Sequence, residues 1–234
     1  MKVISLVFVL VIVLPVKGFA SDCVILLHGL ARTDSSMAKM EEALEREGYK
    51  AINAGYPSRK YEIEKLAGDT ISAALKECGG DKKVNFVTHS MGGILVRQYL
   101  SEYEISNLNH VVMLGPPNQG SEVIDSLGTV PGFKLINGPA GLQLGTGEMS
   151  VPNKLGAADF SLGVIAGAKT INLILSSILP KPNDGKVSVE STMLNGMDDH
   201  IAMPVTHPFM MKNKKVIQQV IYFLKNGKFN ADTI

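Results

Sequence analysis

The sequence has almost no net charge. Its 23 lysines and arginines nearly balance 22 aspartates and glutamates, which leaves a formal charge of +1 over 234 residues. The densest basic cluster, Lys212, Lys214 and Lys215, falls at the start of an expected exposed helix and is interpreted as a solvated face. A surface that binds nucleic acid requires a denser basic patch. We therefore expect no nucleic-acid partner.

Motifs for nucleotides, metals and redox cofactors are also missing. No Gly-Lys-Ser/Thr follows a glycine-rich loop, and "GLQLGTG" lacks both the G-x-G-x-x-G spacing and a preceding strand. The two cysteines do not form a C-x-x-C pair, so neither a cysteine zinc site nor a thioredoxin-like motif is expected. We expect no cofactor and no metal-ligand set. The composition, 45% hydrophobic and 19% charged, is that of a globular domain and excludes a disordered chain.

The longest hydrophobic run lies at the beginning of the chain. It extends over the twelve residues 3–14 and is followed by Gly18-Phe19-Ala20, whose small residues are typical of a signal-peptidase site. Twelve residues span about 18 Å as a helix, less than the roughly 30 Å of a bilayer core. We expect residues 1–20 to be a signal peptide cleaved near Ala20, with export to the periplasm or the medium. An N-terminal membrane anchor is the alternative, because Lys17 is unusual so near the cut.

Export would make the two cysteines candidates for a disulfide. Disulfides persist in oxidising compartments. Cys23 and Cys78 precede the strand-like segments "CVILLH" and "KKVNFVT", whose starting ends would come within disulfide range if the strands were neighbours. Two separate buried thiols remain the alternative.

Strand and helix signals alternate along the remaining chain. Strands are expected at 23–28, 49–53, 84–88, 110–114, 162–166 and 201–205, and helices at 33–47, 63–77 and around 216–224. Continuous apolar strands indicate burial on both faces. The sequence therefore predicts a single α/β domain over residues 21–234. We expect a three-layer sandwich whose mostly parallel sheet of about six strands has helices on both faces.

The pattern loosens between residues 116 and 183. Glycine and proline are frequent there, as in "GTVPGF" and "NGPAGLQLGTG", and the helical pieces are short. Loops of this length are usually functional or disordered. Residues 121–160 are therefore the candidate for a cap or lid insertion.

One strand followed directly by a helix carries the sharpest chemical signal. The segment "VNFVTHSMGGILVRQYL" places Ser90 at the turn between the two elements. It resembles the nucleophile elbow of α/β-hydrolases, in which the serine backbone is strained and small residues are needed two places before and after it. Gly92 fits, whereas Thr88 stands where the motif usually has glycine and calls for a wider crossing of strand and helix. An ordinary turn that opens a helix is the alternative.

The resemblance implies an acid and then a histidine farther along the chain. His207 is the expected base, because it follows the last expected strand and precedes the last helix. His110 and His200 stand at the starts of strands, the wrong end of the sheet. Asp184, in an Asp-Gly turn, is the expected acid, although such a turn does not require a catalytic role. Its rivals are Asp159, Asp198 and Asp199.

Two backbone amides are expected to bind the oxyanion of a reacting ester. One belongs to Met91, which follows the serine at the start of a helix. The other belongs to Leu30 in "LLHGLAR", which resembles the His-Gly turn of lipases and esterases. Gly29 would let the backbone come close, and His28 is interpreted as a loop-shaping residue. The expected apolar rim of the site consists of Leu30, Met91, Leu142 and Leu144, with burial in the core as the alternative.

From Cys23 to the last helix, the chain resembles small bacterial secreted lipases and esterases. The resemblance implies a serine-dependent carboxylic ester hydrolase that acts on lipid or acyl esters through an acyl-enzyme, with transient contact with a lipid surface. Two alternatives stay open. One is an acyltransferase that uses the same triad, and the other is a catalytically silent binding protein on the same scaffold.

Overall fold

The computed structural model describes residues 22–233. The strands are β1 (Cys23–Leu27), β2 (Lys50–Ala54), β3 (Val84–His89), β4 (Leu108–Leu114), β5 (Leu162–Gly167) and β6 (Asp199–Met203). The α-helices are α1 (Ala38–Arg46), α2 (Ile63–Cys78), α3 (Met91–Glu102), α4 (Glu122–Leu127), α5 (Phe133–Leu142), α6 (Val151–Lys154), α7 (Leu173–Ile178) and α8 (Lys214–Asn226). Short 3-10 helices occur at Asp34–Ser36, Glu190–Thr192, His207–Lys212 and Ala231–Thr233. The expected signal peptide, residues 1–20, lies outside the described residues.

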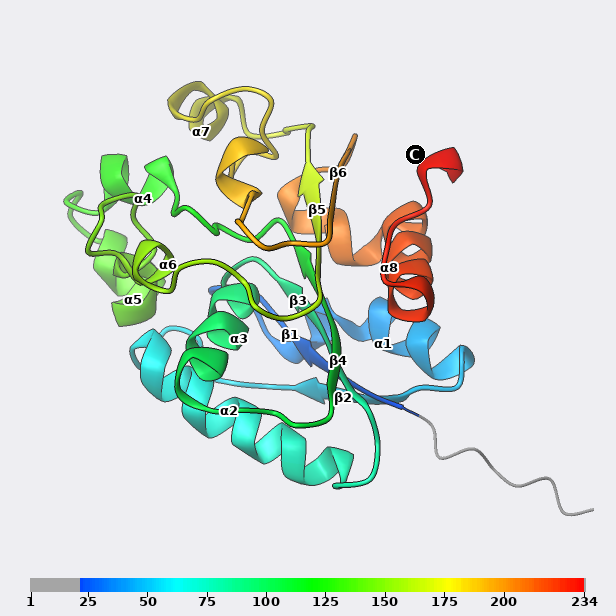
Figure 1. Cartoon of the computed structure of the whole chain (residues 1–234). Helices are drawn as coiled ribbons and strands as arrows, with labels where there is room; N and C mark the ends of the chain where they lie inside the picture. The colour runs from blue at the N-terminus through cyan, green and yellow to red at the C-terminus, as the bar shows by residue number, and fades with distance from the viewer. Residues whose placement is uncertain (1–21, 234) are drawn as a thin grey trace, which may run out of the picture.

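The strands form one sheet in the order β2-β1-β3-β4-β5-β6, and every neighbouring pair is parallel (Figure 1). The prediction of a mostly parallel sheet of about six strands is confirmed. The main difference lies in two boundaries, since β4 begins at Leu108 and β6 at Asp199, each two residues earlier than expected. Because all described strands run the same way, the loops that follow them share one edge of the sheet.

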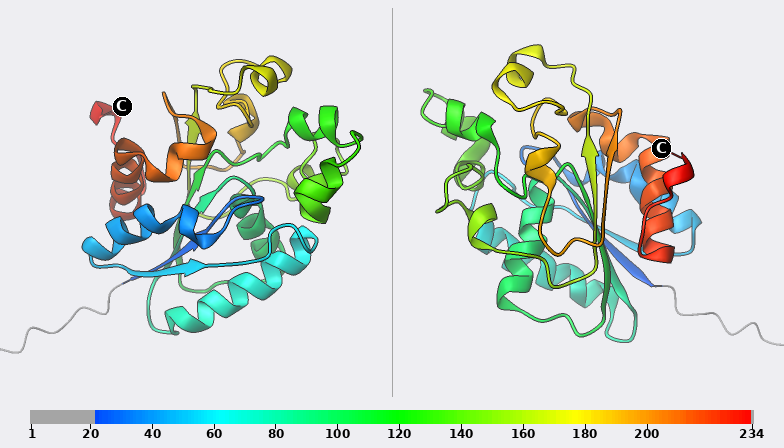
Figure 2. Two further views of the ribbon diagram at one scale, coloured as in Figure 1. Left: turned by 180° about the vertical axis from the view of Figure 1, so that it is seen from behind. Right: turned by 45° about the horizontal axis from the view of Figure 1, so that its top comes forward.

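Helices cover both faces of the sheet, as the continuous apolar strands predict. One apolar cluster joins the sheet to α2 and α3, and a second joins it to α1 and α8 (Figure 2). Adjacent strand residues alternate between the clusters: Ile25 packs in the first and Val24 in the second. Each large side chain buried in this way, such as Phe223 of α8, contributes roughly 1.5–3 kcal/mol. The three-layer sandwich is confirmed.

Cys23 and Cys78 form a disulfide, with their Cα atoms 5.6 Å apart. Cys78 is the last residue of α2, and Cys23 opens β1, where it pairs in register with Val84 of β3. The bond therefore ties the end of a covering helix to the starting edge of the sheet.

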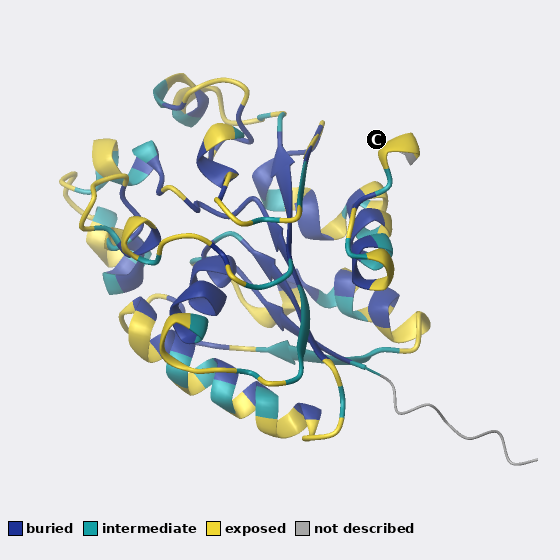
Figure 3. Ribbon diagram, in the orientation of Figure 1, coloured by how far each residue is buried: buried dark blue, intermediate teal, exposed yellow. Residues whose placement is uncertain are grey.

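The loosely patterned segment contains the short helices α4, α5, α6 and α7. The two faces of the sheet are covered by the other four helices, α1, α2, α3 and α8 (Figure 1). Exposed residues are frequent on α5 and α7, whereas the central strands are buried (Figure 3). Among the helices within residues 22–233, none combines the length and apolarity needed to cross a bilayer.

Candidate active site

Ser90 occupies the turn between β3 and α3 in a strained backbone conformation. Its φ and ψ are 54° and −124°. A positive φ at a residue with a side chain costs of order 1–3 kcal/mol and must be held by its surroundings. The Ser90 N–H donates to the Leu114 carbonyl of the neighbouring strand at 2.8 Å. The residue that caps an ordinary helix has an extended backbone. The alternative interpretation, an ordinary turn that opens a helix, therefore does not fit Ser90.

Glycines on α3 supply the room that this turn needs. A Cβ atom on Gly92 would lie 2.6 Å from the Leu27 carbonyl oxygen, so α3 approaches β1 as closely as it does only because Gly92 lacks a side chain. Thr88, the departure from the usual motif, is buried. A Cβ on Gly93 would come within 3.2 Å of the Thr88 hydroxyl. The space for the threonine side chain is therefore provided by Gly93.

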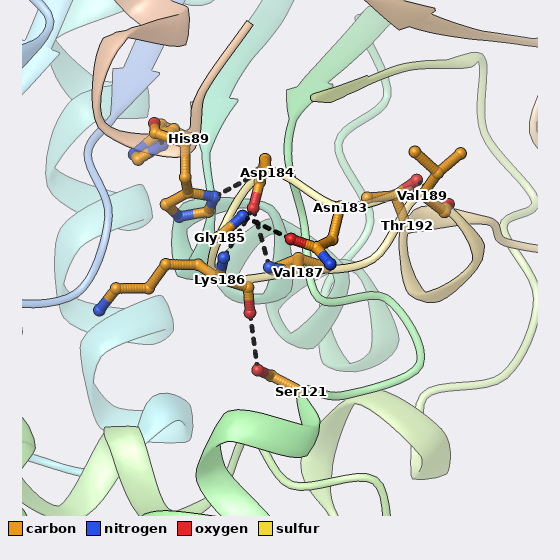
Figure 4. A network of polar contacts seen from close by, with 10 residues as sticks. His89, Ser121, Asn183, Asp184, Gly185, Lys186, Val187, Val189 and Thr192 are labelled. Carbon is orange, nitrogen blue, oxygen red and sulfur yellow. Dashed lines mark hydrogen bonds and ion pairs between the residues drawn. The ribbon is translucent and has the colours of Figure 1, made fainter. Parts of the chain in front are cut away.

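Asp184 and His207 form a buried hydrogen-bonded pair. The distance between Asp184 Oδ2 and His207 Nδ1 is 2.7 Å, and the two residues are 1% and 5% exposed. The other carboxylate oxygen accepts backbone N–H bonds from Lys186 at 2.9 Å and Val187 at 2.8 Å (Figure 4). With Nδ1–H donating to the carboxylate, Nε2 of His207 carries the free lone pair that a general base requires.

The loop that carries Asp184 is itself braced. The Asn183 side chain accepts the Gly185 N–H at 3.1 Å, and the Ser121 hydroxyl donates to the Lys186 carbonyl at 2.9 Å (Figure 4). Gly115, at the end of β4, lies beside the acid. A Cβ there would stand 3.0 Å from Asp184 Oδ2, and its φ of +54° also favours glycine. These contacts hold the carboxylate in one orientation.

A cavity of about 310 Å³ has both Ser90 and His207 in its wall. Much of the remaining wall is apolar and comes from α4, α5, α7 and the loop before α6. The apolar residues are Val123, Ile124, Leu127, Phe133, Ile136, Leu144 and Leu175. The cavity is therefore suited to an apolar group next to the serine.

The expected oxyanion donors, Leu30 and Met91, come from the loop after β1 and from the start of α3. Leu30 lines the cavity, and Met91 is the first residue of α3. A Cβ on Gly29 would lie 3.1 Å from the Ser90 Cβ, so this glycine lets the loop after β1 come close to Ser90.

The prediction of an apolar rim formed by Leu30, Met91, Leu142 and Leu144 is wrong for two residues. The Met91 side chain is fully buried in the core, and Leu142 lines a separate hollow with Glu64, whereas Leu30 and Leu144 do line the cavity.

Comparison with known proteins identifies the architecture. A family model described as alpha/beta hydrolase fold matches residues 22–130. The mature lipase BlEst2 of Bacillus licheniformis superimposes with a TM-score of 0.71 at 20% identity, over 88% of this chain and 92% of that one. This chain has the α/β-hydrolase fold. No curated protein sequence matches it.

Two further solved structures share the α/β-hydrolase fold with this chain. The lipase of Staphylococcus hyicus has a TM-score of 0.58 at 13% identity and covers 82% of this chain and 89% of its own. The metagenomic carboxyl esterase MGS0156 has a TM-score of 0.63 at 17% identity, over 80% of this chain and 65% of that one. At these identities the likeness concerns the fold.

In this α/β-hydrolase fold, His28 shapes the loop after β1. Its ring stacks on Tyr56, with ring centres 4.0 Å apart and planes 9° from parallel. The Nδ1–H donates to the Gly29 carbonyl at 2.8 Å, and the Tyr56 hydroxyl donates to the His28 carbonyl. Burial lowers the pKa of His28 and so keeps the ring neutral. His28 does not line the cavity that holds Ser90.

The rival residues lie away from the α/β-hydrolase site. They are His110, His200, Asp159, Asp198 and Asp199, and they fall before or near the start of β4, β5 and β6. The Ser161 hydroxyl donates to Asp198 at 2.6 Å and contacts His110 Nδ1 at 2.8 Å. His200 Nε2 contacts the Thr192 hydroxyl at 2.9 Å. Asp199 accepts backbone N–H bonds from His200 and Phe229, and Asp159 is exposed. None of the five residues lines the cavity that contains Ser90.

Three titratable residues that line the α/β-hydrolase cavity were missed by sequence reasoning. They are His89, Arg32 and Lys186. Each stands one or two positions from a residue that was singled out, namely Ser90, Leu30 and Asp184 respectively. That adjacency was the available signal, because neighbours of a residue in a site-forming loop often reach the same site.

Proposed function

We propose that this protein is a serine-dependent carboxylic ester hydrolase that acts on lipid or acyl esters through an acyl-enzyme intermediate. One observation carries the proposal: the buried Asp184–His207 pair, 2.7 Å between Oδ2 and Nδ1, reaches the same cavity as Ser90. The names of solved structures with the same fold, two lipases and a carboxyl esterase, favour esters as substrates. The apolar wall of the cavity favours an acyl chain over a peptide.

The reaction begins at Ser90. His207 Nε2 accepts the hydroxyl proton while Ser90 Oγ bonds to the ester carbonyl carbon, and Asp184 stabilises the imidazolium that forms. The negative oxygen of the tetrahedral intermediate is bound by the backbone amides of Leu30 and Met91. His207 then gives its proton to the alcohol oxygen as the carbon–oxygen bond breaks.

Water completes the cycle. It attacks the acyl-enzyme carbonyl while His207 accepts a proton from it, and the second tetrahedral intermediate collapses. The acid is released, and Ser90 Oγ recovers its proton from His207. The neutral imidazole and the free hydroxyl are both regenerated.

The proposal includes transient contact with a lipid surface. Exposed apolar side chains occur on α5 and α7: Leu135 is 86% exposed, Leu173 78% and Ile174 79%. The same two helices contribute Ile136 and Leu175 to the cavity wall. A lipid surface that covered these side chains would bring its esters to the opening beside Ser90.

Export is also part of the proposal. Cleavage near Ala20 would release residues 21–234 into the periplasm or the medium. The Cys23–Cys78 disulfide supports this location, because such bonds persist in oxidising compartments.

The test uses purified residues 21–234, a series of p-nitrophenyl esters of increasing chain length, and a fluorophosphonate label. We expect turnover and labelling of the native protein, and loss of both in Ser90→Ala, with kcat lower by several orders of magnitude. Ser101→Ala, at the far end of α3, is the matched control. Labelling without turnover, followed by acyl transfer to an added alcohol, would identify an acyltransferase. A native protein that neither labels nor turns over ester would disprove the proposal.

A further inference from the structure

Two cationic side chains line the cavity that contains Ser90 and His207. Arg32 belongs to the loop after β1, two residues beyond Leu30, and Lys186 lies two residues beyond Asp184. The two cations thus reach the cavity from loops that are more than 150 positions apart in the sequence. Neither has a part in the ester chemistry derived above.

These two cations lack a carboxylate partner at ion-pair distance within residues 22–233. The ion pairs of 4.0 Å or less found there involve other basic groups. The acid that acts electrostatically on Lys186 is Asp184, whose oxygens already accept from His207 and two backbone amides. Figure 4 shows the Lys186 side chain extending away from that carboxylate. The ammonium is therefore available to a ligand.

The two positive charges are close enough to affect each other. Burial lowers the pKa of Lys186, and the Arg32 guanidinium lowers it further, while Asp184 opposes both effects. Like charges held near one another raise the electrostatic energy of the empty site. An anion bound between them would remove this repulsion and would gain charge-assisted hydrogen bonds, which arginine makes in pairs to phosphate or carboxylate oxygens.

Other residues of the same cavity wall are apolar. Phe133 and Ile136 of α5, with Ile124 and Leu127 of α4, line the same space of about 310 Å³. A ligand that satisfies both parts of the wall has a hydrocarbon chain at one end and a negative charge at the other. Ser90 would then meet the ester group between them.

We propose that the substrate is an anionic lipid ester whose alcohol portion carries a phosphate. The acyl chain lies against α4 and α5, and the phosphate oxygens bind Arg32 and Lys186. This inference rests on the proposed function, because it concerns the substrate of the same serine. It makes the two cations determinants of specificity.

The experiment compares two substrates that differ only in the phosphate: 1-dodecanoylglycerol and 1-dodecanoylglycerol 3-phosphate, each in neutral detergent micelles. We expect kcat/KM to favour the phosphate ester by about tenfold at low ionic strength, and the preference to shrink in salt. Arg32→Gln and Lys186→Gln should each reduce the ratio of the two kcat/KM values several-fold, and the double variant should bring it near one. Lys39→Gln, an exposed lysine on α1, should leave the ratio unchanged.

One further arm separates recognition in the site from attraction to a charged surface. The neutral ester is measured in micelles that contain hexadecyl phosphate at the mole fraction of the anionic substrate. If this addition raises neutral-ester turnover to the level of the phosphate ester, surface attraction explains the preference and the inference is wrong. It is also wrong if the native protein hydrolyses the neutral ester equally well, or if the double variant keeps the native ratio. Absence of turnover on both substrates would instead disprove the hydrolase proposal.

Discussion

The His89 side chain holds the backbone of His207. Its Nε2–H donates to the His207 carbonyl oxygen at 3.0 Å, and the two rings lie 4.7 Å apart between centres. His89 is buried and directly precedes Ser90, so the contact joins the strand that carries the serine to the loop that carries the expected base. Burial and the neighbouring His207 hold the pKa of His89 well below its ordinary value, and the ring is neutral at physiological pH.

Removal of this bond should impair catalysis more than substrate binding. His89→Ala leaves a buried carbonyl without its donor and frees the His207 loop to move, so we expect kcat to fall about tenfold or more with a smaller change in KM. His89→Gln keeps an N–H donor and should recover part of the loss. Steady-state kinetics on p-nitrophenyl butyrate would measure both values. An unchanged kcat in His89→Ala would show that the contact does not position His207.

Asp184→Asn should lower kcat by two to four orders of magnitude. The amide preserves the size of the side chain but cannot stabilise the imidazolium, and it allows the wrong His207 tautomer. Asp159→Asn is the control, because that exposed rival lies before β5. Equal kcat in the two variants would rule out Asp184 as the acid.

Buried and half-buried histidines should make stability depend on pH. Burial lowers the pKa values of His28, His89 and His200 below the ordinary value of 6.5, so near pH 6 the unfolded chain binds more protons than the folded one. Their stabilising contribution is fully present above pH 6.5 and is lost as the pH falls below it toward each folded-state pKa. Urea unfolding between pH 8 and pH 5 should show this decline.

His89→Gln should flatten that decline, because burial and the neighbouring His207 hold the pKa of His89 well below its ordinary value. The quantity compared is the slope of the free energy of unfolding against pH. An overall loss of stability in the variant therefore does not obscure the result. A free energy of unfolding that stays constant from pH 8 to pH 5 would contradict the assignment of neutral buried rings.

Arg97 should be among the side chains whose loss destabilises the fold most. Its buried guanidinium donates to the carbonyls of Asn118 at 3.0 Å and of Pro152 and Gly156 at 2.8 Å each. It therefore ties α3 to the loop after β4, to α6 and to the residues just after α6. Burial lowers its pKa to about 10, which leaves it charged at neutral pH. Arg97→Met leaves these carbonyls unpaired and should cost about 2–4 kcal/mol in urea unfolding.

Arg46→Met supplies the matched control. Arg46 is exposed on α1 and pairs with Glu42 at 3.8 Å, so its loss should cost less than about 0.5 kcal/mol. Similar losses in the two variants would show that the Arg97 bonds add little to stability.

Leu135→Ser and Leu173→Ser should reduce turnover of an emulsified long-chain ester more than that of a dissolved short-chain ester. Each substitution removes an exposed apolar side chain from the surface that is proposed to meet lipid. Tyr103→Ser, which alters a 51% exposed side chain just after α3, should not change the ratio of the two activities. A ratio that stays at the native value in the double leucine variant would exclude this surface.

Local patterns were sufficient to predict much of the molecule. Continuous apolar runs such as that of β1 indicate a strand buried on both faces, and the segment around Ser90 marks a strand-to-helix turn. The order of Asp184 and His207 along the chain led to two residues that the structure brings to 2.7 Å. These features could be predicted because residues close together in the sequence set the periodicity of a strand or helix and the position of the loop that follows it.

Contacts between distant segments were decided by the tertiary structure. The sequence does not say that Gly93 makes room for Thr88, that Met91 turns its side chain into the core, or that His89 reaches the His207 carbonyl. It also does not say that Arg32 and Lys186 line the same cavity. Each depends on how α3 and three loops pack at one edge of the sheet. The sequence by itself therefore determined the elements and the chemical types of the site, while packing decided which side chains face the cavity and what charge they present there.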